Sequence, residues 1–292
     1  MTVKRRIKEV KAMQLPWFIV DDVIRTALKE DIHYLDTTTD LMIPADARTT
    51  AFFLVKAEGV VCGLDVALRV FRLLDDTLKV EILLPEGTCV KPGDLIARVE
   101  GYTRALLKGE RTALNLLQHM SGVATATARA VEKVRGTRAV ITDTRKTLPG
   151  LRALQKYAVT VGGGKNHRFN LSDGAMLKDN HIDAAGGIPQ AIAAIRNKLG
   201  HMVKLEVETR NLDEVRQALE AGADLIMLDN MDCTAMAEAV QMVGGRALLE
   251  ASGGIREDTL RAVAETGVDI ISIGALTHSV KALDISMKIQ KS

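Results

Sequence analysis

The stretch VKLEVETRNLDEVRQALEAGADLIMLDN, residues 203–230, decides the fold class. It begins with a short apolar strand, Val203–Val207, and continues with apolar residues at helical spacing over Asp213–Ala221. Gly222 follows where a glycine commonly ends a helix, and a second apolar strand is expected at Leu225–Leu228. A strand, a helix and another strand of these lengths are typical of a parallel sheet covered by helices.

The same unit recurs throughout the chain after Gly136. Further strands are expected at Ala139–Thr142, Ala175–Leu177, Ala247–Leu249 and Ile270–Ile273, with a helix over Arg256–Thr266. The last four expected strands start at residues 203, 225, 247 and 270. Regular units of this length favour a barrel of the TIM type with fewer than eight strands over an open doubly wound sheet.

The N-terminal third has a different pattern. A helix around Val20–Leu28 and strands at Thr49–Ala57, Leu78–Leu84 and Leu95–Val99 predict an α+β domain. From Tyr102 to about Arg135 the apolar spacing predicts two successive helices, broken near Ser121-Gly122.

The last segment, Leu283–Ile289, alternates apolar and polar residues at every step. Such alternation indicates a strand buried on one face only, whereas a barrel strand is covered on both faces. We therefore expect the chain to leave the barrel and pair with the N-terminal sheet.

Composition indicates a small-molecule partner. The 292 residues are 47% hydrophobic, which is enough for a large core. The 39 basic and 37 acidic residues give a formal charge of +2, so no global field favours nucleic acid or an anionic membrane, and aromatics at 3% offer little for base stacking. No apolar stretch suits a secretory signal or a membrane span, so we expect a soluble, cytoplasmic protein.

Polar and glycine residues follow the expected barrel strands, at the end where barrel enzymes place their active sites. One such loop is explained by ordinary solvation, but six on one face favour a site. The six are Asp143–Lys146, Lys178–His181, Glu208–Arg210, Asp229-Asn230, Ser252–Gly254 and Gly274-Ala275.

Positive side chains gather in the early loops, which predicts a substrate with several negative groups. Pairing with Asp143 and Asp173 is the plainer alternative, and it explains only part of this cluster. The cluster comprises Arg145, Lys146, His167, Arg168 and Lys178.

The late loops, Ser252–Gly254 and Gly274-Ala275, expose backbone N–H groups where barrels often bind a phosphate. The alternative is that these glycines only permit tight turns. Glu206 and Glu208 share one strand face and Asp229 follows the next strand, so these acids suit Mg²⁺ on substrate phosphates or neutralise the lysines. Which of Glu206 and Glu208 meets the metal stays open.

Several long motifs in order resemble the quinolinate phosphoribosyltransferases, also called nicotinate-nucleotide pyrophosphorylases (carboxylating). The resemblance covers nearly the whole chain, with one small departure at Leu148, where Thr or Ser is more usual. The motifs are residues 143–152 (DTRKTLPGLR), 162–168 (GGGKNHR), 178–182 (KDNHI), 228–230 (LDN), 250–255 (EASGGI) and 267–278 (GVDIISIGALTH).

The resemblance implies an N-terminal α/β sandwich domain, residues 1–113 with 279–292, and an incomplete β/α barrel catalytic domain, residues 114–278. It implies a glycosyltransferase that makes nicotinate mononucleotide, pyrophosphate and CO₂ from quinolinate and phosphoribosyl pyrophosphate in NAD biosynthesis, with Mg²⁺ and no organic cofactor. It also implies a homodimer with shared active sites, or a larger assembly of dimers.

The resemblance further implies a role for each matching residue. Quinolinate is held by Arg145, His167 and Arg168, with Arg111 reaching in from the partner subunit. Lys146 and Lys178 lie between the substrates, Glu208 and Asp229 lie at the Mg²⁺-bound ribose pyrophosphate, and the 5-phosphate takes Ser252, Gly253, Gly254, Gly274 and Ala275.

Two rival interpretations remain. Lys178, at a strand end, is also placed like the Schiff-base lysine of a barrel aldolase. A paralogue linked to molybdenum uptake shares the fold and some motifs, although the complete set of cations and acids argues against it.

Overall fold

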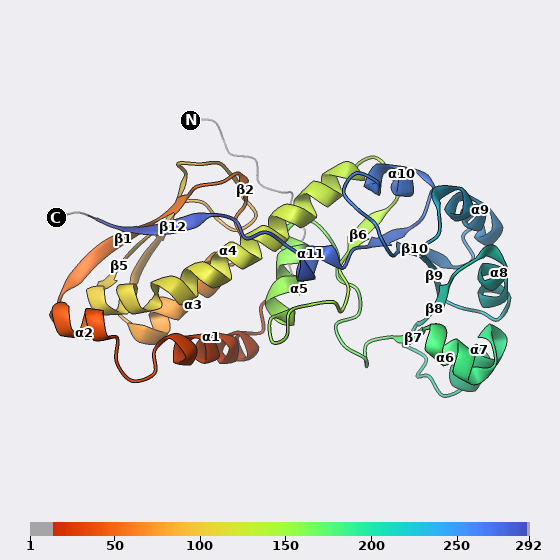
Figure 1. The fold of residues 1–292 in the computed structure, drawn as a ribbon, viewed down its shortest axis with the longest axis horizontal. Coiled ribbons are helices and arrows are strands. Elements are labelled where there is room, and N and C mark those ends of the chain that lie inside the picture. Colours follow the sequence, from red (N-terminus) through yellow and green to blue (C-terminus); the bar gives the residue numbers. More distant parts are fainter. Residues whose placement is uncertain (1–13, 291–292) are drawn as a thin grey trace. The chain divides into compact units, whose positions relative to one another are not determined.

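The structure, a computed structural model, describes residues 14–290 and divides into two compact units (Figure 1). Unit 1 contains residues 14–128, 147–163 and 276–290. Unit 2 contains residues 129–146 and 164–275. The domain boundary predicted between residues 113 and 114 lies inside helix α4 (Thr103–Lys133) and stays a prediction.

Unit 1 is built on a four-stranded antiparallel sheet with the order β12-β1-β5-β3. Its strands are β1 (Arg48–Val55), β3 (Lys79–Ile82), β5 (Leu95–Tyr102) and β12 (Ile285–Ile289), and β2 (Gly59–Val60) pairs separately with β4 (Cys89–Val90). In the β1–β12 pair, Val55 lies opposite Ile285 and Ala51 opposite Ile289. The return of the C-terminal strand to the N-terminal sheet is therefore confirmed.

One face of this sheet is buried against helix, because buried and more exposed residues alternate along its strands. In β1, Ala51, Phe53 and Val55 are buried while the residues between them are not. Phe53 meets Phe71 edge to face with the ring centroids 6.1 Å apart, and burying each ring stabilises the fold by about 1.5–3 kcal/mol. Unit 1 contains the helices α1 (Trp17–Asp31), α2 (Thr37–Met42), α3 (Leu64–Leu74), α5 (Arg152–Val161), α11 (Ala275–His278) and the first part of α4, and α1 contacts both α3 and α5.

The break predicted near Ser121-Gly122 is wrong, because α4 is one helix of 31 residues. Gly122 serves close packing instead: a Cβ added there would meet the Ala282 Cα at 3.1 Å. Ser121 accepts a hydrogen bond from the Cys62 N–H at 3.0 Å. Both signals for a turn are thus explained by contacts with other segments, which the local sequence pattern does not contain.

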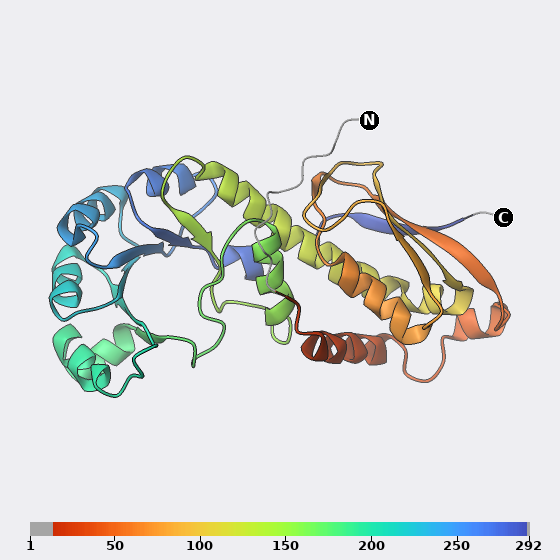
Figure 2. The ribbon, with the colours of Figure 1, turned by 180° about the vertical axis from the view of Figure 1, so that it is seen from behind.

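Unit 2 is a curved sheet of six parallel strands with the order β6-β11-β10-β9-β8-β7, and its helices lie on the outer face (Figure 2). Among the residues described, no ladder joins β6 to β7, so the barrel is incomplete, as expected. The strands are β6 (Val140–Thr142), β7 (Ala175–Leu177), β8 (Leu205–Thr209), β9 (Leu225–Asp229), β10 (Leu248–Ser252) and β11 (Ile270–Ser272). The helices are α6 (Asp179–Ala185), α7 (Ile188–Arg196), α8 (Leu212–Glu220), α9 (Cys233–Val243) and α10 (Leu260–Glu265).

Local signals set the β8–α8–β9 unit. The Asn211 side chain caps α8 by accepting the Glu214 N–H at 2.9 Å, and Gly222 follows the helix with φ +84°. The expected strand ends at Val207, but β8 runs to Thr209 and so carries Glu208 as well as Glu206. Likewise β10 extends to Ser252 and includes Glu250. Charged residues interrupted the apolar runs, yet their side chains belong to these strands.

No helix between residues 14 and 290 has the length and apolar character needed to cross a membrane.

Candidate active site

A cavity of about 600 Å³ lies in unit 2, and it brings together most of the residues predicted from the sequence. The cations of the early loops, the acids of β8 and β9 and the first glycine loop all contribute to it. Its lining comprises Thr144, Arg145, Lys146, His167, Arg168, Met176, Lys178, Glu208, Met227, Asp229, Asn230, Glu250, Ser252, Gly253, Gly254 and Ser272.

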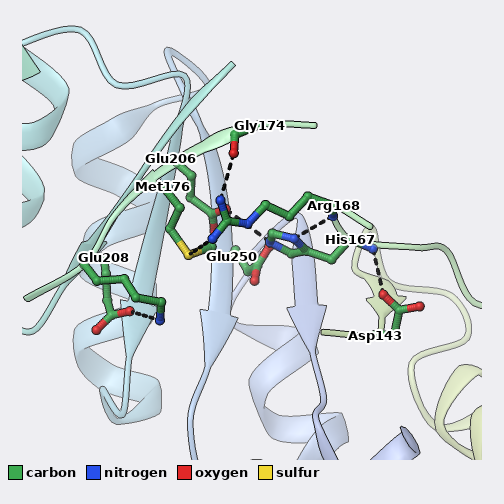
Figure 3. A network of polar contacts seen from close by, with 9 residues as sticks. Asp143, His167, Arg168, Gly174, Met176, Glu206, Glu208 and Glu250 are labelled. Atoms are coloured by element: carbon green, nitrogen blue, oxygen red, sulfur yellow. Dashed lines mark hydrogen bonds and ion pairs between the residues drawn. The ribbon is translucent and has the colours of Figure 1, made fainter. Parts of the chain in front are cut away.

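The loop that carries His167 and Arg168 is fixed by Asp143, a fully buried acid at the end of β6 (Figure 3). One carboxylate oxygen accepts the His167 N–H at 2.9 Å, and the other accepts the Asn166 amide at 2.6 Å. The sequence offered Asp143 as an ion-pair partner for neighbouring cations. Its hydrogen bonds give Asp143 a second role, because they fix the loop of Asn166 and His167 beside the end of β6.

The His167 ring points toward two buried acids (Figure 3). Its Nε2 lies 3.1 Å from a Glu206 oxygen and 3.5 Å from a Glu250 oxygen, and the two acids are 5% and 1% exposed. The Nδ1 atom accepts the Arg168 N–H at 2.7 Å, so the ring proton belongs on Nε2, between the carboxylates. Burial, with the charge of Glu206 second, raises the pKa of Glu250 to about 7.

These three groups have the composition of a metal site, since their ligand atoms lie within 4.8 Å of one another. The hydrogen bond at Nδ1 argues against that interpretation, because an Nε2 that carries a proton cannot bind a metal. We therefore interpret His167, Glu206 and Glu250 as a network that holds a proton.

The Arg168 side chain lies beside β7, where two contacts hold its guanidinium group. Its guanidinium donates to the Gly174 carbonyl at 2.8 Å and contacts the Met176 sulfur at 3.6 Å. Burial, followed by the nearby charge of Arg145, lowers the pKa of Arg168 from its ordinary value. The crowding of two guanidinium groups favours a bound anion between them.

The two acids that face the cavity are Glu208 and Asp229. Glu208 accepts a hydrogen bond from the Lys178 ammonium group at 3.0 Å, and the Glu208 side chain is 13% exposed. Glu206 does not line this cavity and contacts His167 instead. The pair left open by the sequence is thus separated by position, with Glu208 toward the cavity and Glu206 behind it.

The glycine loops differ from each other. Ser252, Gly253 and Gly254 line the cavity, and both glycines have positive φ, +84° and +59°. Gly274 and Ala275 are outside the lining. Arg111 is an exposed residue of α4 in unit 1, so its predicted role in a partner's site is not tested by a single chain.

Sequence reasoning missed four residues of this cavity. Glu250 and Ser272 were assigned only to motifs, and the predicted strand stopped one residue before Glu250. Met176 and Met227 also line the cavity. In the sequence they look like ordinary apolar strand residues, so nothing in the pattern marks them as part of a site.

The fold and the cavity define a class: an open β/α barrel enzyme that binds polyanionic small molecules at the carboxyl ends of its strands. Two family models match this chain, the quinolinate phosphoribosyl transferase N-terminal domain over residues 36–121 and the C-terminal domain over residues 123–288. The chain therefore belongs to the quinolinate phosphoribosyltransferase family.

Individual relatives agree with this assignment. The chain is 45% identical to a nicotinate-nucleotide pyrophosphorylase (carboxylating) of Mycobacterium leprae, over 92% of this chain and 96% of the relative. It is 42% identical to a mitochondrial quinolinate phosphoribosyltransferase (decarboxylating) of Nicotiana glauca, over 96% of this chain and 85% of the relative. The crystal structure of NadC from Streptococcus pyogenes superposes with a TM-score of 0.92 at 42% identity, covering 96% of this chain and 99% of that one.

Proposed function

We propose that this chain transfers the phosphoribosyl group of phosphoribosyl pyrophosphate to quinolinate, with loss of CO₂, and so makes nicotinate mononucleotide for NAD biosynthesis. The observation that carries the proposal is the cavity of unit 2. Guanidinium and ammonium groups line it together with the acids Glu208 and Asp229 and the loop Ser252–Gly254. Two anionic substrates, one of them carried with a metal ion, suit such a mixed lining.

Quinolinate takes the cationic part in this proposal. Its two carboxylates suit the planar forks of Arg145 and Arg168, with His167 beside them. Lys146 and Lys178 lie where the two substrates meet and offset the charge of pyrophosphate as it leaves.

Phosphoribosyl pyrophosphate takes the remaining part. The loop Ser252–Gly254, with Gly274 and Ala275, is assigned to the 5-phosphate. Hard carboxylate oxygens suit Mg²⁺, and both Glu208 and Asp229 face the cavity, so these residues fit the ion. When bound, Mg²⁺ supplies positive charge that stabilises the departing pyrophosphate.

The chemistry follows from positioning and electrostatics. The bond between ribose C1 and pyrophosphate breaks, C1 becomes oxocarbenium-like, and the pyridine nitrogen forms the new bond to C1. The positive ring nitrogen then stabilises the electron pair left on C2 as the 2-carboxylate departs as CO₂, and C2 takes up a proton. No organic cofactor is needed, because the substrate's own ring accepts the electrons.

A homodimer with shared sites is part of the proposal. Large apolar side chains are exposed on α1, on α2 and between them, including Phe18 at 75%, Tyr34 at 88% and Leu41 at 75%. Exposed apolar surface of this kind commonly marks an interface. Arg111 is exposed on the same unit, as a residue that enters a partner's site must be. The cytoplasmic location remains a prediction from the sequence.

The test is a substrate panel. Purified protein with Mg²⁺ and phosphoribosyl pyrophosphate should convert quinolinate, and not nicotinic acid, to nicotinate mononucleotide. Conversion of nicotinic acid alone would move the chain to salvage chemistry. Inactivity with both would favour the non-catalytic paralogue, and a borohydride-trapped imine at Lys178 would favour the aldolase.

A further inference from the structure

Asn230 has an unusual backbone conformation, and the proposed mechanism gives this residue no role. Between residues 14 and 290 it is the one residue other than glycine with a positive φ, at +54°. That conformation is unfavourable for an L-residue, although asparagine tolerates it better than most. It occurs directly after Asp229, where β9 ends at the cavity.

Asn230 contacts two parts of the site at once. Its Nδ2 donates to Asp229 Oδ2 at 2.9 Å, and its backbone N–H donates to the Ser252 carbonyl at 3.0 Å. A carboxylate only accepts hydrogen bonds, so the bond to Asp229 fixes which end of the amide is nitrogen. The amide oxygen is thereby turned away from Asp229.

The other end of the amide lies against the glycine loop. A Cβ added to Gly253 would meet the Asn230 amide oxygen first and its Cγ at 2.5 Å, so a side chain at position 253 would displace this amide. Gly253 itself has φ +84°. The loop therefore turns at Gly253, and the absence of a side chain there leaves room for the Asn230 amide.

We propose that Asn230 is a positioning residue that joins Asp229 to the loop Ser252–Gly254, so that the acid and the phosphate loop face the cavity as one preorganised unit. This inference rests on the proposed function, in which both groups hold the same substrate molecule. Phosphoribosyl pyrophosphate has its 5-phosphate and its pyrophosphate at opposite ends of one ribose. Its binding therefore depends on a fixed separation between the two groups that receive these ends.

Asn230→Gly is the decisive variant, because glycine accepts the positive φ and removes only the amide. We expect kcat/KM for phosphoribosyl pyrophosphate to fall about 10- to 100-fold, as for other residues that orient a ligand-binding carboxylate. The KM for quinolinate should change by less than about 2-fold, since that substrate contacts neither group. Asn230→Asp keeps the shape but sets a second carboxylate beside Asp229 and near the anionic substrate, so a larger loss is expected.

A purely structural role predicts the opposite pattern. Asn230→Gly would then keep full activity. Asn230→Ala, which strains the backbone, would be less stable and would show equal losses of kcat/KM for both substrates. That result overturns the proposal. Equal losses for the two substrates in Asn230→Gly would also overturn it. Calorimetric titration of wild type and Asn230→Gly with Mg²⁺ and phosphoribosyl pyrophosphate alone keeps the test separate from the proposed function. Weaker binding in the variant supports the inference even if quinolinate proves not to be the second substrate, and equal binding contradicts it.

Discussion

Replacing Lys178 by alanine should reduce catalysis strongly while leaving the fold nearly unchanged. Lys178 lines the cavity, and its ammonium contacts Glu208 at 3.0 Å with the lysine side chain 48% exposed. An ion pair with one partner so exposed contributes about 0–1 kcal/mol to stability. The backbone N–H of Lys178 donates to His181 Nδ1 at 3.0 Å at the start of α6, and alanine keeps this bond.

The catalytic loss is larger because the substrate is charged. A unit charge at roughly 4 Å from the ammonium interacts by about 4 kcal/mol at an effective dielectric constant of 20. Hydration of the vacated space recovers part of this, so we expect a loss of about 2–4 kcal/mol of transition-state stabilisation. That corresponds to roughly 30- to 1000-fold in kcat/KM.

The assay is steady-state formation of nicotinate mononucleotide, with urea unfolding measured on the same preparations. Lys198→Ala, at an exposed position after α7, is the matched control and should keep normal kinetics. Lys178→Arg should retain more activity than Lys178→Ala, because arginine keeps the charge; an imine-forming lysine would tolerate neither. Near-normal kinetics in Lys178→Ala would refute the reasoning.

Three further predictions follow from the same site. Arg111→Ala should be nearly inactive, but mixing it with Lys178→Ala under subunit exchange should restore about a quarter of wild-type activity, because half the dimers then hold one intact site; no recovery would contradict shared sites. Glu208→Gln should raise the Mg²⁺ concentration needed for half-maximal turnover, and an unchanged requirement would remove Glu208 from the metal. The raised pKa of Glu250, about 7, means that folding favours its protonated form, so the free energy of unfolding should fall as pH rises from about 4 to 7, by roughly 3 kcal/mol at most. Glu250→Gln should flatten that slope in urea titrations at pH 5 and 8, and equal slopes would assign the effect elsewhere.

The strands of unit 2 could be predicted because each is a short apolar run with a glycine or a polar turn after it. β9 was predicted from Leu225 and found there, and the alternation of Leu283–Ile289 correctly assigned the last strand to unit 1. These are local signals that burial on one or two faces imposes directly on the sequence.

Contacts between distant segments could not be predicted in the same way. Gly122 looks like a helix end until Ala282 is placed beside it. Glu206 looks like a metal ligand or a partner for a lysine, and Glu250 looks like part of a motif, until His167 meets both. In each case the deciding partner lies on another element, so the meaning of the residue depends on tertiary packing.

The site was predicted better in composition than in geometry. The cations and the acids Glu208 and Asp229 share one cavity, as expected from loops at one edge of a parallel sheet. The positive φ of Asn230 and the network of His167, Glu206 and Glu250 depend on angles and distances that no residue pattern encodes.

The most direct test of the account follows the 2-carboxylate of quinolinate. Quinolinate labelled at that carboxylate carbon should release one labelled CO₂ for each nicotinate mononucleotide formed, only when phosphoribosyl pyrophosphate and Mg²⁺ are both present. Release of label without phosphoribosyl pyrophosphate, or nucleotide formed with the label retained, would contradict a transfer whose new positive nitrogen drives the loss of CO₂.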